Sequence, residues 1–143
     1  MPNCGIDVDI LQVITIAHNT FGRIGISDIN RACTGQIEGA GTASAHYTNG
    51  GGHGVDFYSL GGTATNGADA NAIKLLKALD PVKPKGSHTG QSECRSAAGD
   101  VLTLGNLGQF EDTCTHVHVQ VDPTSPTPLN LCQLVLDLGK QSG

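Results

Sequence analysis

The sequence is poor in aromatic residues, with no tryptophan, two tyrosines and three phenylalanines among 143 residues. Carbohydrate-binding modules normally offer aromatic platforms to sugar rings, so this scarcity argues against that class. Charged residues make up only 15% of the chain and the net charge is −5, which argues against nucleic acid or an anionic membrane surface as a partner. No apolar run is long enough to span a bilayer, so no membrane insertion is expected.

The five cysteines include no Cys-x-x-Cys pair, which argues against a zinc ribbon or a thioredoxin-like site. Two disulfides and one free thiol fit an extracellular or cell-envelope protein. The alternative is five buried thiols in a protein made in the cytosol. Sequence alone does not reveal the connectivity, and Cys33, which lacks a partner motif, is expected to be structural.

The length predicts a single domain over residues 1–143, large enough to bury a core. Twenty glycines predict long irregular loops around a modest core. The predicted helices and antiparallel-type strands segregate along the chain. This pattern predicts an α+β fold with a small, mainly antiparallel sheet and flanking helices.

Three segments are predicted to be helices, with apolar residues at helical spacing in the first two: residues 7–20, 66–79 and 129–138. Three others are predicted strands: residues 23–29, 54–60 and 115–121. We expect irregular structure over residues 32–49 and 86–99, and a short helix over residues 101–110.

The tripeptide His116-Val117-His118 is the most informative feature of the chain. It lies in a stretch that alternates polar and apolar residues with period two, as a half-buried strand does. Side chains at positions i and i+2 share a strand face, so both imidazoles are expected to point the same way. A metal ion is the commonest user of such a pair. With His46 and Asp56 upstream, His118 completes a His/Asp/His set with an open fourth position, which is typical of catalytic zinc.

Three motifs follow one another along the chain: Ser44-Ala45-His46, Gly52-His53-Gly54-Val55-Asp56-Phe57 and His116-Val117-His118. In this order they resemble the zinc peptidase superfamily of D-Ala-D-Ala carboxypeptidases, L-alanyl-D-glutamate endopeptidases of phage endolysins and Hedgehog domains. The resemblance implies a Hedgehog/DD-peptidase-like fold. It also implies that His46, Asp56 and His118 bind Zn²⁺ and that His116 takes part in the chemistry.

A further segment, Ile26-Ser27-Asp28-Ile29-Asn30-Arg31, resembles the family's Ser-Gly-Tyr-Arg stretch, whose arginine helps to hold substrate. The resemblance therefore implies that Arg31 contributes to substrate binding.

The chain departs from the family pattern in several places. His46 and Asp56 are ten residues apart, where the family motif has seven, so residues 47–52 are expected to bulge, as glycines permit. Gly54 replaces the usual alanine. His53 is an alternative ligand to His46, because it lies nearer to Asp56. His18 and His88 are expected to be incidental.

The downstream motif lacks the Glu-x-Trp-His form of many relatives, and with it the glutamate that often acts as their base. Glu111 or Asp112 is an alternative general base to His116, although a solvated turn also accounts for both carboxylates.

Together these features predict a monomeric zinc peptidase, either an endopeptidase or a carboxypeptidase, that cleaves an amide bond in the stem peptide of bacterial peptidoglycan. Its expected location is extracellular or in the cell envelope, either secreted or released as a phage lytic enzyme. The first alternative is a zinc-containing binding module of the same fold that does not cleave. The second is a domain held together by disulfides without a metal.

Overall fold

The structure, a computed structural model, describes residues 4–122. Within them the chain forms a six-stranded sheet in the order β1-β2-β6-β4-β5, with β3 paired to β2. Every strand pair is antiparallel except β4 with β5. The predicted α+β class with a mainly antiparallel sheet is confirmed, whereas the helix predicted over 129–138 lies outside the described residues.

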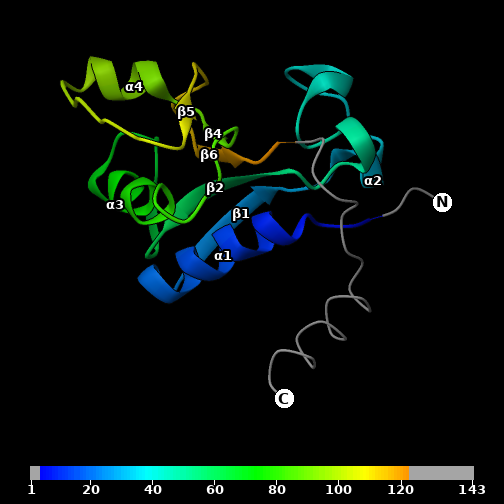
Figure 1. Ribbon diagram of the computed structural model, residues 1–143, viewed down its shortest axis with the longest axis horizontal. Coiled ribbons are helices and arrows are strands. Elements are labelled where there is room, and N and C mark those ends of the chain that lie inside the picture. The colour runs from blue at the N-terminus through cyan, green and yellow to red at the C-terminus, as the bar shows by residue number, and fades with distance from the viewer. Residues whose placement is uncertain (1–3, 123–143) are drawn as a thin grey trace.

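The strands are β1 (Ile24–Asp28), β2 (Gly54–Leu60), β3 (Thr63–Ala64), β4 (His88–Thr89), β5 (Gly108–Gln109) and β6 (Val117–Gln120). The α-helices are α1 (Val8–Phe21), α2 (Arg31–Thr34), α3 (Ala70–Leu79) and α4 (Ser92–Ala97). Two 3₁₀ turns, η1 (Gly41–Ala43) and η2 (Thr48–Gly50), follow α2. In Figure 1, α2 lies at one end of the view, and α3 and α4 lie at the other.

The core lies between the sheet and the helices α1 and α3. Its fully buried members come from α1, β2, α3 and β6, and include Ile10, Val13, Val55, Phe57, Leu75, Leu76, Leu79, Val117 and Val119. Burying such a side chain contributes about 1.5–3 kcal/mol. Because β2 and β6 supply the centre of this core, the polar residues on the same two strands are held on a rigid support.

Helix α3 begins at Ala70, four residues later than the predicted start at residue 66. The side-chain oxygen of Asn66 accepts hydrogen bonds from the backbone N–H groups of Ala68 and Asp69 and so forms a turn. Asp69 then caps the helix by accepting from the N–H of Ala72. Local side-chain hydrogen bonds therefore replace the first predicted helical turn.

The prediction of irregular structure over residues 86–99 was wrong, because this segment contains β4 and α4. No side chain caps α4, so the sequence carries no start signal for it. The buried guanidinium of Arg95 holds the helix instead, by donating to the carbonyls of Gly67 and Gly90 and to Gln109 Oε1. These partners lie far apart in the sequence, which is why local patterning missed the helix.

The helix predicted over residues 101–110 is also wrong. This segment contains no helix: residues 105–106 form a bend and Gly108–Gln109 form β5, which pairs in parallel with β4. The carboxylate of Asp80, at the end of α3, accepts hydrogen bonds from the backbone N–H groups of Gly105, Asn106 and Leu107. These N–H groups are then unavailable for a helix.

The stretch predicted to be irregular over residues 32–49 contains most of α2, all of η1 and the start of η2. Asn30 caps α2 by accepting from the N–H of Cys33. The strand predicted over residues 115–121 is shorter in the structure, since β6 begins at Val117 and leaves His116 just outside it.

Two disulfides join Cys4 to Cys33 and Cys94 to Cys114. Disulfides persist in oxidising compartments, so this pairing fits a secreted protein. Cys33 is structural, as predicted, whereas Cys132 lies outside the described residues. Among the described helices, none has the length and apolar character needed to cross a membrane.

Candidate metal centre

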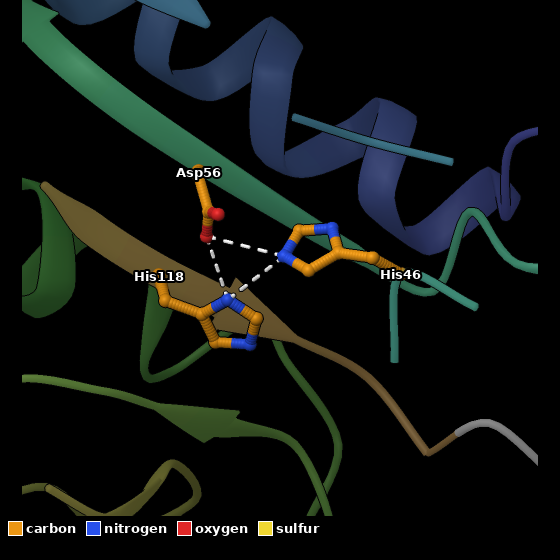
Figure 2. Close-up of side chains that lie close together, drawn as sticks. All are labelled: His46, Asp56 and His118. Carbon is orange, nitrogen blue, oxygen red and sulfur yellow. Dashed lines mark hydrogen bonds and ion pairs between the residues drawn. The ribbon is translucent and has the colours of Figure 1, made fainter. Parts of the chain in front are cut away.

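Two neighbouring strands and one loop bring together His46, Asp56 and His118, a group that can hold a metal ion (Figure 2). Asp56 on β2 pairs in register with His118 on β6. Residues directly opposite each other on antiparallel strands project their side chains from the same face, so this pairing places carboxylate and imidazole side by side. His46 comes from the loop between η1 and η2, where its carbonyl accepts a hydrogen bond from the N–H of Arg31 at 2.7 Å.

The spacing of the three donor atoms suits a tetrahedral ion. Asp56 Oδ1 lies 2.7 Å from His118 Nδ1 and 3.2 Å from His46 Nε2, and the two nitrogens are 3.2 Å apart. Ligands bound tetrahedrally at ordinary zinc–nitrogen and zinc–oxygen distances are separated by about 3.3 Å. The three atoms thus form nearly one face of a coordination tetrahedron.

The outer nitrogens of His46 and His118 each have their own acceptor. His46 Nδ1 lies 3.1 Å from the carbonyl oxygen of Ile29, and His118 Nε2 lies 2.8 Å from Gln120 Oε1. Because these oxygens only accept, the outer nitrogens can donate to them, which leaves His46 Nε2 and His118 Nδ1, the nitrogens nearest Asp56, available to a metal ion. This arrangement matches metal-binding histidines, whose second nitrogen normally donates to an oxygen.

Asp56 supplies negative charge to the cluster. Burial by itself would raise the pKa of this carboxyl group, but hydrogen bonding and charge from His118 and His46 outweigh burial and hold its pKa well below the usual range. The carboxylate is therefore ionised and faces two nitrogens at close range. A proton on a facing nitrogen, or a metal ion bound by the three atoms, can balance this negative charge.

His116 lies beside the cluster, with its Nε2 atom 3.6 Å from Asp56 Oδ1. The same nitrogen is 3.2 Å from Asp112 Oδ2 and 3.2 Å from Gln91 Nε2. The hydrogen bond with Asp112 raises the pKa of His116, and the charge of Asp56 adds to it, against the opposing effect of burial. When protonated, Nε2 donates to Asp112. When bare, it accepts from the Gln91 amide, so it has a partner in either state.

The guanidinium of Arg31 faces two carboxylates. Its Nε donates to Asp28 Oδ2, and one terminal nitrogen lies 3.8 Å from Asp56 Oδ2. The other terminal nitrogen donates to the carbonyl of Glu38 at 3.3 Å. Arg31 therefore stands next to the cluster, with its charge largely matched by Asp28.

All five predicted site residues, His46, Asp56, His118, His116 and Arg31, line one cleft of about 710 Å³. The segments 36–46 and 110–113 contribute much of the remaining lining. Glu111 and Asp112, the alternative bases, also line this cleft, and Asp112 is engaged by His116.

The structure does not bring the alternative ligand His53 into the cluster. Its ring is fully buried, with Nδ1 2.9 Å from Asp7 Oδ2 and Nε2 2.9 Å from the carbonyl of Asn49. His18 lies in α1 and His88 in β4, and neither belongs to the metal-binding group. His53 instead ties the glycine-rich loop to the start of α1.

Sequence reasoning missed three residues that hold the site: Gln120, Gln91 and Asp28. Gln120 stands two positions after His118 on the same strand, so the alternation that indicated the strand also placed both on one face. Gln91 lies in the stretch predicted to be irregular, and no local pattern indicates its role. Asp28 falls within the segment quoted for Arg31, three residues before it.

No protein-family model, curated protein or solved structure matches this chain.

Proposed function

We propose that this protein is a zinc-dependent peptidase of the superfamily named above, acting on the peptide part of bacterial peptidoglycan. One observation carries the proposal: His46, Asp56 and His118 bring three atoms that can bind a metal within 3.2 Å of one another, close to tetrahedral spacing. Two imidazoles and one carboxylate suit zinc, and three protein ligands leave a coordination position for chemistry.

Amide hydrolysis requires a base while water attacks and an acid when the amine leaves. His46, Asp56 and His118 would hold the zinc ion, which would supply Lewis-acid chemistry to the attacking water and to the carbonyl. His116 Nε2 takes the proton from the water, and Asp112 stabilises the resulting imidazolium through its contact at 3.2 Å. His116 then returns the proton to the leaving amine, and the Gln91 amide donates to the bare nitrogen.

The substrate is proposed on the order of the three sequence motifs and on the cleft. The stem peptide of peptidoglycan lies outside the cytoplasm, in the setting that fits a disulfide-bonded protein. Substrate binding by Arg31 also remains a prediction, and it requires a substrate carboxylate to compete with Asp28 for the guanidinium.

The pairing of Arg31 with Asp28 favours the alternative function, a zinc-containing binding module. Among the described residues that line the cleft, Arg31 is the sole lysine or arginine, and Asp28 already engages it. A cleft without an available cation offers less to an anionic substrate group.

The deciding experiment is mass spectrometry of products after the zinc-loaded protein is incubated with purified peptidoglycan, with and without a zinc chelator. Peptide fragments that appear only without chelator are the expected result, and they identify the bond that is cut. Absence of products from folded protein with one zinc per chain contradicts the peptidase and supports the binding module. Absence of zinc in elemental analysis supports the metal-free domain.

A further inference from the structure

Gln91 lies between the two histidines of the His116-Val117-His118 tripeptide and contacts both. Its Oε1 atom accepts a hydrogen bond from the backbone N–H of His118 at 2.9 Å. Its Nε2 atom lies 3.2 Å from the ring Nε2 of His116 and 3.4 Å from the carbonyl oxygen of Thr113. One side chain thus joins the strand that carries a metal ligand to the ring that lies beside the metal cluster.

The position of Gln91 is tightly constrained. The residue is fully buried, and its φ of 64° is in the left-handed region that residues other than glycine seldom occupy. Such a conformation persists only where the surroundings enforce it, and it is concentrated at functional sites. Arg95 supplies part of this enforcement by donating to the carbonyl of Gly90 at 2.7 Å.

Gly67 provides the space behind Gln91. A Cβ atom at Gly67 would lie 2.5 Å from the Cβ of Gln91 and 3.1 Å from the carbonyl oxygen of His116. Because Gly67 has no side chain, Gln91 and His116 can pack directly against its backbone, just before α3. Two separate segments, the turn at Gly67 and residues 113–118, converge on the Gln91 side chain, as expected of a support rather than of a surface loop.

An amide is the chemical group that this position needs. The backbone N–H of His118 requires an acceptor, whereas the Thr113 carbonyl and a bare His116 nitrogen require donors. A glutamine provides both at the correct reach. Glutamate provides the acceptor without the donors, and leucine provides neither.

We propose that Gln91 is a positioning residue that sets the His116 imidazole relative to the metal ligand His118. Its Oε1 atom binds the backbone N–H of His118 and its Nε2 atom contacts the ring of His116. Together these contacts keep His116 Nε2 directed at the cleft beside Asp56. The consequence for turnover rests on the proposed peptidase function, whereas the placement of the ring does not.

Thr89 offers a matched control for this proposal. Its buried hydroxyl donates to the backbone carbonyl of His118 at 2.8 Å, so it supports the same residue from the other peptide group. Its described hydrogen bonds do not involve His116. Thr89→Val therefore removes one support of the ligand strand and leaves the contact between Gln91 and His116 in place.

The test compares Gln91→Glu, Gln91→Leu and Thr89→Val in the zinc-loaded full chain. Two quantities are measured: steady-state kinetics on a peptidoglycan peptide, and the ¹⁵N and ¹H NMR signals of the His116 ring. Misplacing a reacting group by about 1 Å can cost about 100-fold in rate, so we expect kcat to fall about 10- to 100-fold in both Gln91 variants with KM little changed. The His116 ring signals should shift in both Gln91 variants and stay in place in Thr89→Val.

Zinc affinity distinguishes the contact of Gln91 with the His118 backbone from its contact with the His116 ring. Gln91→Glu keeps the acceptor for His118 and should bind zinc as the parent does, whereas Gln91→Leu should bind it more weakly. Unchanged His116 signals in Gln91→Glu overturn the proposal, as does an equal loss of kcat in Thr89→Val. If Gln91→Leu does not fold, Gln91→Glu decides alone. If the parent protein cleaves nothing, the peptidase function fails, and the NMR comparison still decides the placement of His116.

Discussion

The side-chain oxygen of Gln120 accepts a hydrogen bond from Nε2 of His118, with 2.8 Å between the two atoms. The bond fixes the ring so that Nδ1 faces Asp56. Loss of such an outer partner commonly lowers metal affinity by about 10- to 100-fold. We expect Gln120→Leu to weaken zinc binding by that factor, measured by competition with a chromophoric chelator. Gln12→Leu, on the exposed side of α1, is the control and should bind zinc normally.

The ligands and His116 should respond differently to substitution. His46→Ala and His118→Ala each remove one of the three proposed ligands, so zinc content and peptidase activity should be lost together. His116→Asn removes the proposed proton-transfer group and leaves the proposed ligands intact, so zinc should remain and turnover should fall about 100- to 10,000-fold. Elemental analysis and product assays on the same samples test both expectations. Loss of zinc from His116→Asn would contradict this assignment and would make His116, rather than His118, the metal ligand.

His53 should prove structural rather than metal-binding. Its ring is buried against Asp7 and the carbonyl of Asn49, so His53→Ala leaves buried polar partners unsatisfied. We expect the free energy of unfolding to fall by at least about 1–3 kcal/mol, with one zinc per folded chain retained. Chemical denaturation and elemental analysis measure these two quantities. A fold of unchanged stability that has lost its zinc would make His53 the ligand in place of His46.

Asp80 should make the free energy of unfolding depend on pH in the acidic range. Burial opposes ionisation, but hydrogen bonds from the backbone N–H groups of Leu107, Gly105 and Asn106 outweigh it and lower the pKa of Asp80. A lowered pKa in the folded state means that the unfolded chain takes up a proton first as the pH falls. The contribution of Asp80 is therefore present above about pH 4 and is lost below it.

Asp80→Asn removes this contribution, because an amide keeps one acceptor oxygen and loses the charge. Thermal melts between pH 2 and pH 7 should show the variant less stable than the parent at neutral pH, with the difference narrowing in acid. Asp100→Asn, at a half-buried carboxylate like Asp80, is a matched control. A difference that stayed constant with pH would contradict the role of the ionised carboxylate.

Local patterning was sufficient where a segment meets its own hydrogen-bonding and packing needs. Strand β2 has the predicted bounds of 54–60, and α1 ends at Gly22, whose φ of 72° suits glycine at a helix end. The metal-binding group was also predictable, because His46, Asp56 and His118 are the residue types that bind zinc and His118 lies on a recognisable strand. The turn η2 lies between His46 and Asp56 in the sequence, and the two side chains still come within 3.2 Å of each other.

Local patterning failed where distant residues supply the stabilisation. Helix α4 lacks a side-chain cap and depends on Arg95, whose partners Gly67 and Gln109 belong to other segments. The bend at residues 105–106 depends on the carboxylate of Asp80, 25 residues before Gly105. A window of neighbouring residues contains neither interaction.

By itself, the sequence determined the α+β class, the central strands and the residues that can bind a metal, because periodicity and ligand chemistry are properties of short segments. Only the tertiary structure decided which nitrogen of each histidine faces Asp56, since the carbonyl of Ile29 and the side chain of Gln120 set the two rings. It also decided that Gln91 contacts His116 and that Arg31 faces Asp28. Hydrogen bonds are directional and reach only about 3 Å, so these assignments follow from the packing of the whole chain.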